Sequence, residues 1–294
     1  MSDPAPCTTF RPRARGVPEL DGKRRRIVAT SSTSDLIVGT DGPVGRIRLN
    51  RPKALHALNT AMCEGILQAL DQWRGDLGVE AVVIDHAASP DGDPKLSRGF
   101  CAGGDISGMD VKSPLEGRER MRLSHQLIRL MVMGSVPVVA AIEGFCVGAG
   151  LSLACACDTI VAAEDARLGA GFGRIGLMAD LGLPHTLPLR VGQGRARQIF
   201  LYHEQMTAAA AERIGLVDHV VPKGHALDKA MEKARFLAEQ APGPMALTKQ
   251  MLGEGLDRAL EQERHFQSTL FMTEDFAEGR AAFLGKRQPE FKGG

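Results

Sequence analysis

The chain has 294 residues, of which 44% are hydrophobic and 24% charged, as in a globular protein with a substantial core. A formal net charge of +1 gives no reason to expect nucleic acid or an anionic membrane as a partner of the whole molecule. No uncharged apolar stretch reaches the ~18 residues of a transmembrane helix, and no apolar signal segment begins the chain. The six cysteines form no CxxC pair, so we expect a cytoplasmic protein with buried, reduced thiols and no metal site.

The first part of the chain differs from the rest in composition. Residues 1–34 are rich in Pro, Arg, Ser and Thr and show little periodicity, which predicts a disordered or loosely attached tail. Residues 1–26 contain seven Lys or Arg against three acids. Two interpretations are open: an extension without function, or a basic contact site for an anionic partner such as RNA.

Regular structure is expected from residue 35 onward. Two short alternating runs, 36–38 and 45–49, flank Asp41-Gly42-Pro43 and predict a hairpin. Apolar residues at helical spacing predict a helix over 58–73, with Asn59 or Thr60 as its cap. The further expected elements are, in chain order, a strand at 79–84, a helix at 119–133, a strand at 136–142, an apolar helix at 149–156, a strand at 159–163 and a helix at 208–214.

Strands that alternate with helices indicate an α/β core. From residue 225 to 286 the pattern is helical almost throughout, with breaks expected at Pro242 and Pro244. We therefore expect three parts: the tail over 1–34, an α/β body over 35–222 and an all-helical part over 223–294.

Two glycine-rich turns are the first candidates for chemistry. They read Gly-Phe-Cys-Ala-Gly-Gly-Asp at 99–105 and Gly-Phe-Cys-Val-Gly-Ala-Gly at 144–150, and the second precedes the apolar helix. Such turns let backbone N–H groups face a ligand, and a helix N-terminus adds partial positive charge. Together they could form an oxyanion hole, whereas each alone is better explained as a tight turn that permits close packing.

Three other motifs compete for the second turn. A dinucleotide fingerprint lacks its third glycine, and a P-loop lacks its Gly-Lys-Ser/Thr. Residues 150–154 approximate the nucleophile elbow of a serine hydrolase around Ser152, with Asp180 and then His185 or His203 following in the order of that class. The turn precedes Ser152, however, instead of lying at the serine, so we do not favour a hydrolase.

The two turns resemble the crotonase (enoyl-CoA hydratase/isomerase) superfamily when they are taken with three other segments: 50–59, 136–144 and 279–291. The resemblance covers residues 35–294. It implies a spiral of ββα units followed by a C-terminal helical domain that forms trimers, which commonly pair into hexamers. It also implies an acyl-CoA thioester as substrate, an expected role in fatty acid metabolism, and no cofactor, because coenzyme A belongs to the substrate.

The resemblance assigns roles to individual positions. The backbone N–H groups of Gly104 and Ala149 would form the oxyanion hole. Phe283 and Lys286 would contact coenzyme A, either in their own subunit or in a neighbouring one. The further residues expected at the substrate are Lys53, Ala54, His56, Ala102, Asp105, Ile106, Gly148, Ser152 and Phe172.

This chain departs from the hydratases that it resembles. Those proteins place glutamates at the positions of Ser152 and Phe172, and neither residue can deprotonate water as a carboxylate pair would. The remaining acid is Asp180, which resembles the aspartate of isomerase-type relatives. Its apolar sequence neighbours are expected to raise its pKa and strengthen it as a base; the alternative role is a helix N-cap.

A single base suits one reaction in particular. It can remove a carbon-bound proton and return it two carbons away, which shifts a double bond, whereas hydration usually needs a second acid. The sequence therefore predicts an enoyl-CoA isomerase with Asp180 as base. The alternatives are an enoyl-CoA hydratase or another crotonase-type reaction with an unrecognised acid, and a non-catalytic acyl-CoA binder.

Overall fold

The computed structural model describes residues 34–75, 78–88 and 99–294. Apart from Ser34, the predicted tail lies outside these residues, together with its basic cluster. No helix of the described part is long and apolar enough to cross a membrane. The five cysteines of this part are free and buried, as predicted.

The larger of two sheets has six strands in the order β1-β2-β3-β4-β6-β9. The predicted hairpin is confirmed, since β1 (Leu36–Asp41) pairs antiparallel with β2 (Val44–Leu49), and Gly42 has the positive φ of +60° that the tight turn requires. The other pairs in this sheet are parallel. Their strands are β3 (Ala81–His86), β4 (Val138–Ile142), β6 (Thr159–Ala163) and β9 (His219–Val221).

The smaller sheet has three strands, β5 (Phe145–Val147), β7 (Arg167–Gly169) and β8 (Met206–Thr207), in the order β5-β7-β8. The chain passes from β4 to β5 to helix α3 (Ala149–Cys155), and then from β6 to β7 to the 3₁₀ helix η3 (Phe172–Ile175). Each passage is one ββα unit of a spiral. Bridges between Gly99 and Gly144 and between Cys101 and Cys146 bring the two glycine-rich turns side by side.

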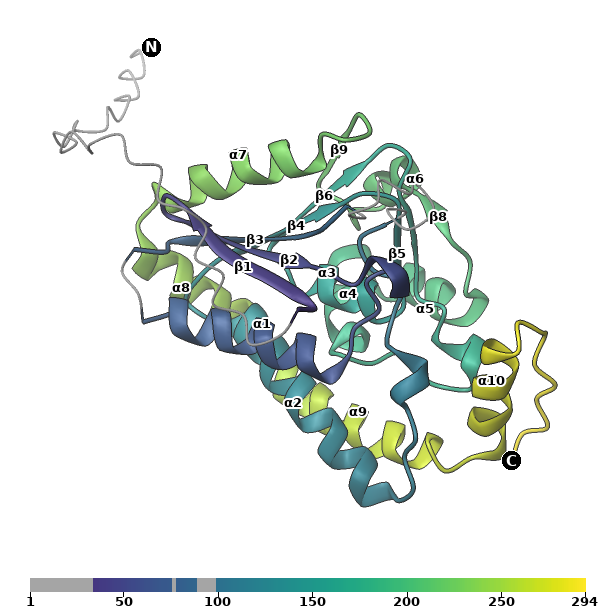
Figure 1. Ribbon diagram of the computed structural model, residues 1–294. Helices are drawn as coiled ribbons and strands as arrows, with labels where there is room; N and C mark the ends of the chain where they lie inside the picture. The colour runs from purple at the N-terminus through teal and green to yellow at the C-terminus, as the bar shows by residue number, and fades with distance from the viewer. Residues whose placement is uncertain (1–33, 76–77, 89–98) are drawn as a thin grey trace, which may run out of the picture.

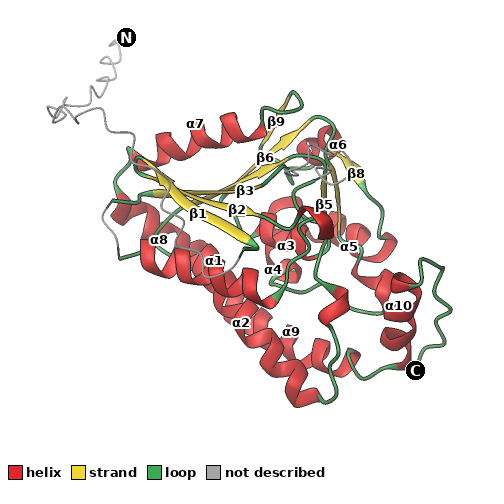
Figure 2. Cartoon of the chain, viewed as in Figure 1, coloured by secondary structure: helices red, strands yellow, loops and turns green. Residues whose placement is uncertain are grey.

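Helices cover both faces of the six-stranded sheet (Figures 1 and 2). Side chains alternate between the faces of a strand, so Val83 and Val139 pack against α7 (Ala226–Ala238), while Val82 and Ile84 belong to the larger core on the other side. That core includes α1 (Thr60–Trp73) and α2 (Pro114–Met133). The predicted boundary at residue 222 precedes α7.

Most of the remaining helices lie beneath the sheet or at the end of the molecule that carries the C-terminus, and one short helix packs beside β8 and β9 (Figure 1). Helix α9 packs along α2, and α10 packs on η3. The buried Lys249 of α8 donates to the Met131 carbonyl and to the Asp158 carboxylate, which fixes α8 to the core. The helices not yet bounded are α4 (Leu183–Val191), α5 (Gln193–Tyr202), α6 (Ala208–Arg213), α8 (Pro242–Leu252), α9 (Leu256–Leu270) and α10 (Glu274–Leu284).

Local signals explain where several helices begin. The Asn59 side chain accepts from the Met62 N–H at 2.8 Å and caps α1, as predicted. Helix α2 begins five residues earlier than expected, because Ser113 caps it and Pro114 takes the first position, where its missing N–H costs nothing. The expected break at Pro244 is wrong, since this residue lies in the first turn of α8.

Candidate active site

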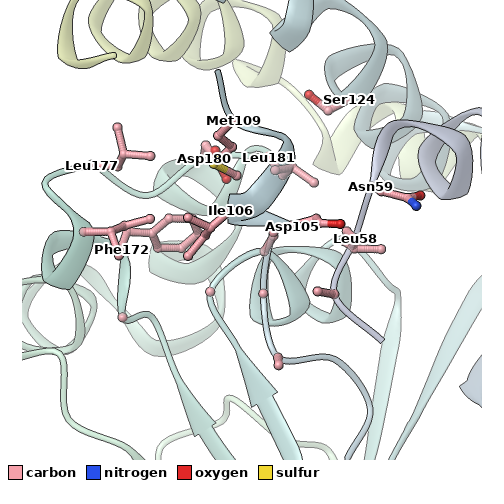
Figure 3. Close-up of a pocket in the computed structure, with 18 of the residues that line it drawn as sticks. Leu58, Asn59, Asp105, Ile106, Met109, Ser124, Phe172, Leu177, Asp180 and Leu181 are labelled. Carbon is pink, nitrogen blue, oxygen red and sulfur yellow. The ribbon is translucent and has the colours of Figure 1, made fainter. Parts of the chain in front are cut away.

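A cavity of about 1000 Å³ opens where the glycine-rich turns meet the helices. Its walls come from residues 53–55 and 57–60, the first turn with η2 (Ile106–Gly108), the first part of α2, the second turn, η3, the loop before α4, and the end of α10. Figure 3 shows the mostly apolar character of the labelled lining, with Ile106, Met109, Phe172, Leu177 and Leu181 around Asp180. A lining of this kind suits an acyl chain.

The two turns place two backbone amides at the cavity. Gly103 and Gly148 have φ of +125° and +56°, and a Cβ added to Gly148 would lie 3.5 Å from the Gly103 Cα. Gly104 and Ala149 both line the cavity, and a Cβ at Gly104 would lie 4.0 Å from that of Ala149. Neither N–H donates to another group in the part of the chain that the structure describes. Ala149 is also the first residue of α3, where the helix dipole favours negative charge.

The Asp180 carboxylate lies in the loop between η3 and α4 and is 8% exposed. Its Oδ2 accepts from Nε2 of Gln267 on α9 at 3.2 Å, while its Oδ1 has no hydrogen-bond partner in the described structure. Gln267 is fixed in turn, because it accepts from the Met178 N–H at 3.3 Å and donates to the Met178 carbonyl at 3.1 Å. One carboxylate oxygen is therefore held and the other is free.

Burial and then the negative charge of Glu263 raise the pKa of Asp180 to about 8, against the lowering effects of the Gln267 hydrogen bond and the Arg120 charge. Glu263 is kept close by His125 Nε2 at 2.8 Å and by the Gly182 N–H at 2.8 Å. A carboxyl group whose pKa lies near neutrality can both accept and return a proton.

The capping role considered for Asp180 is wrong. The N-cap of α4 is Gly182, and no side chain accepts from the first amides of this helix. The Asp180 side chain bonds Gln267 instead, although its backbone carbonyl accepts from the Leu183 N–H at 3.2 Å.

The other acids at the cavity have different environments. Asp105 receives Arg51 Nη2 at 2.9 Å and Ser107 Oγ at 2.5 Å. Burial alone would raise the Asp105 pKa, but the hydrogen bonds from Ser107 and Arg51 together lower it. The further lining acids, Glu64, Glu116 and Glu119, are exposed. Among the described residues, Asp180 is thus the one buried carboxylate that lines the cavity.

The two positions that carry glutamates in the hydratases have no acid–base group. Phe172 lines the cavity with its ring. Ser152 is fully buried in α3, its Oγ lies 3.4 Å from the Gly148 carbonyl oxygen, and it does not line the cavity. The nucleophile-elbow interpretation is therefore wrong, because Ser152 lies inside a helix without access to a substrate.

The residues expected at coenzyme A divide into two groups. Most of them line the cavity: Lys53, Ala54, Ala102, Asp105, Ile106, Gly148 and Phe283. His56 lies behind the lining, where its Nδ1 accepts from the Arg51 N–H at 3.1 Å; burial lowers its pKa to about 4, so it is neutral and shapes the loop. Lys286 is exposed just beyond α10 and does not line the cavity.

Helix α10 completes the cavity of its own chain. Phe283 and Leu284 form part of the lining. Arg280 donates to the carbonyls of Ile106 at 3.2 Å and Ser107 at 3.1 Å, which holds η2 in place. The C-terminal helix therefore contributes to this site without a neighbouring subunit.

Several residues of the site were not identified from the sequence. Glu263 and Gln267 lie one turn apart on the buried face of α9, and buried polar side chains on a helix are a signal of function or a specific partner. Arg120 could not be distinguished in the sequence from the other charged residues of α2. Met109 covers the first turn, since its Cε would lie 2.8 Å from a Cβ at Gly104.

Comparison with known proteins agrees with the resemblance that the sequence shows. Residues 39–294 match the family model described as Enoyl-CoA hydratase/isomerase. A short-chain-enoyl-CoA hydratase of Clostridium acetobutylicum is 32% identical over 261 residues, 87% of this chain and 97% of the relative. A 1,2-epoxyphenylacetyl-CoA isomerase of Escherichia coli is 32% identical over 255 residues, 84% of this chain and 94% of the relative.

A solved structure is also similar over nearly its whole length. The crystal structure of an enoyl-CoA hydratase from Mycobacterium avium subsp. paratuberculosis superposes with a TM-score of 0.77 at 31% identity, covering 88% of this chain and 99% of that chain. The fold and the cavity therefore define an enzyme of the crotonase superfamily. Within it, the chain belongs to the enoyl-CoA hydratase/isomerase family. Its relatives carry both hydratase and isomerase names, so membership alone gives no specific reaction.

Proposed function

We propose that the protein shifts the double bond of an enoyl-CoA thioester, with Asp180 as the single base and acid. The N–H groups of Gly104 and Ala149 would hold the thioester oxygen and stabilise the enolate that forms when a proton leaves carbon 2. Asp180 Oδ1 would take this proton and deliver it to carbon 4, so that the 3-enoyl ester becomes the 2-enoyl ester. The carboxylate accepts one proton and returns it, and the double-bond electrons shift along the chain, so the reaction needs no other reactant.

The observation that carries this proposal is that Asp180, with one free oxygen, is the one buried carboxylate lining the cavity among the described residues. Its pKa of about 8 supports both halves of the transfer near neutral pH. Hydration needs a carboxylate that activates water, and Ser152 and Phe172 replace the residues that supply it in the hydratases that the sequence resembles. The isomerase name of the Escherichia coli relative also supports a double-bond or ring isomerisation.

The test is the conversion of 3-hexenoyl-CoA by wild-type protein and by Asp180→Asn. We expect the variant to lose roughly 10²–10⁴-fold in rate, which is the usual contribution of a positioned base, and to lose exchange of carbon-2 protons with heavy water. Its binding of a saturated acyl-CoA should persist. Glu64→Gln, which changes an exposed acid of the same lining, is the matched control and should stay active.

Other outcomes have defined meanings. Full proton exchange in Asp180→Asn would exclude Asp180 as the base. Rapid hydration of crotonyl-CoA by the wild type would show a hydratase instead. Binding of acyl-CoA without conversion of either ester would favour a non-catalytic binder.

We also propose a homotrimer, or a dimer of trimers, formed through the C-terminal helices. Exposed apolar side chains gather on α8, where Leu247 is 67%, Met251 80% and Leu252 73% exposed. Apolar groups of this size on one short helix are typical of a protein interface.

A further inference from the structure

Arg120 differs from the other arginines of α2 in having no ion pair with any residue that the structure describes. Within the described residues its guanidinium makes one hydrogen bond, a long one of 3.3 Å from Nη1 to the Gly108 carbonyl. The other arginines of the helix are paired with carboxylates: Arg118 with Glu261 at 2.9 Å, Arg122 with Glu119 at 2.7 Å, and Arg129 with Asp257.

This arginine is also part of the cavity wall. Arg120 is half-buried and lines the cavity together with Cys63 and Asp180. Its charge acts on both: burial raises the pKa of the Cys63 thiol to about 12 and Arg120 opposes that rise, as it does for Asp180. The guanidinium therefore shares a cavity with the proposed base and acts on it through charge, and no hydrogen bond joins the two in the described structure.

The surroundings give this charge little compensation. Leu177, Met121 and Phe271 form a buried apolar cluster at the same wall. Glu116 and Glu119 also reach the lining, but Glu116 accepts from the Lys112 N–H at 2.8 Å and Glu119 pairs with Arg122. A wholly hydrocarbon acyl chain would remove water from the guanidinium and offer no partner in return, which is costly. A carboxylate would offer two parallel hydrogen bonds.

We propose that Arg120 binds a carboxylate carried by the acyl group, so that the substrates are CoA thioesters of dicarboxylic acids. This deepens the proposed function and rests on it for the position of the acyl chain. The thioester oxygen lies at Gly104 and Ala149, the reacting carbons pass Asp180, and the distal carboxylate ends at Arg120. Arg120 is then a specificity residue of the acyl site.

Binding of unreactive saturated esters tests this proposal without turnover. We would titrate succinyl-, glutaryl-, adipoyl- and suberoyl-CoA, and the monocarboxylic esters of equal chain length, by calorimetry. The wild type should prefer one diacid ester over its matched monoacid ester by about tenfold or more, the worth of a charged hydrogen bond. Arg120→Met should lose this preference while keeping its affinity for the monoacid ester.

The controls separate the alternatives. Arg118→Met removes a paired arginine of the same helix outside the lining and should keep the preference. Equal weakening of both esters by Arg120→Met would overturn the proposal, because both carry the same CoA phosphates and the arginine would then bind those. No diacid preference in the wild type, or a preference retained in Arg120→Met, would also overturn it.

The outcome is independent of the reaction. If Asp180→Asn shows that the proposed base is wrong, the binding preference can still be measured, and the reverse also holds. Arg120→Lys checks folding and chemistry together, since it keeps the charge but loses the bidentate geometry. We expect it to retain part of the preference.

Discussion

Replacement of Asp180 by asparagine should change how stability depends on pH. The pKa of this carboxyl is about 8 in the folded protein, mainly through burial, against an ordinary value of 3.8. Between these pH values the folded state keeps a proton that the unfolded state releases. The stability that the protonated Asp180 carboxyl contributes is therefore fully present below pH ~4 and is lost as the pH rises through about 8. Asparagine has a similar shape and cannot ionise, so the variant lacks this loss.

The size of the effect follows from the two pKa values. Their difference is about four, and each pKa unit corresponds to roughly 1.4 kcal/mol, so the ionised carboxylate costs on the order of 5 kcal/mol above pH ~8. This is an upper bound, because the Gln267 bond remains and the surroundings relax around the charge. The buried group lies out of solvent, so salt should screen the effect only weakly.

Urea unfolding at pH 5, 7 and 9 measures this pH-dependent change in the free energy of unfolding. The single tryptophan, Trp73, is buried in the core, so its fluorescence reports global unfolding. The stability of Asp180→Asn relative to the wild type should rise from pH 5 to pH 9 by several kcal/mol. Asp105→Asn is the control: the pKa of Asp105 is lowered from 3.8, so its contribution is lost only below pH ~4, and its difference from the wild type should stay constant from pH 5 to pH 9. Parallel wild-type and Asp180→Asn curves would refute the assignment of a buried, proton-holding carboxyl.

Three other changes test the supports of the site. Glu263→Gln removes a negative charge beside Asp180, lowers the pKa of that carboxyl, and should move the acid limb of the kcat/KM profile to lower pH; an unmoved limb would contradict the coupling. Arg280→Met frees η2 and should raise KM about tenfold with little change in unfolding midpoint, measured by steady-state kinetics and denaturation. Met251→Glu should convert the oligomer to monomers in light scattering after size exclusion, and an unchanged mass would place the interface elsewhere.

Strong local signals were enough to predict five of the six strands of the larger sheet. The hairpin around Gly42 and the cap at Asn59 depend on neighbouring residues only, and both are observed. The short strands β5, β7, β8 and β9 were not predicted, because runs of two or three residues show no period of their own. They form only when the spiral brings their backbones together. Helix α4 was not predicted either, because it contains Pro188, which interrupts the helical pattern in the sequence.

The site shows the same division between local and long-range information. Asp180 was identified by its position and its apolar neighbours, and its burial agrees with them. Its partner Gln267 is 87 residues further along the chain, and no spacing rule connects the two. His56 was expected at coenzyme A, yet the positive φ of 56° at this residue belongs to a loop that turns its ring inward toward His86.

The position of the carboxylate also explains why a simple reversion should not restore hydration. Glutamate at 172 would bury a charge beside an apolar wall, and glutamate at 152 would start from a fully buried site inside α3. The proposed base instead lies before α4 and is held from α9, on the C-terminal side of the chain. In the proposed reaction, Gln267 would hold the Asp180 carboxylate and Glu263 would hold its loop through the Gly182 N–H. For this chain, the position of the buried carboxylate therefore supports a more specific proposal than overall identity does, because relatives of equal identity carry both hydratase and isomerase names.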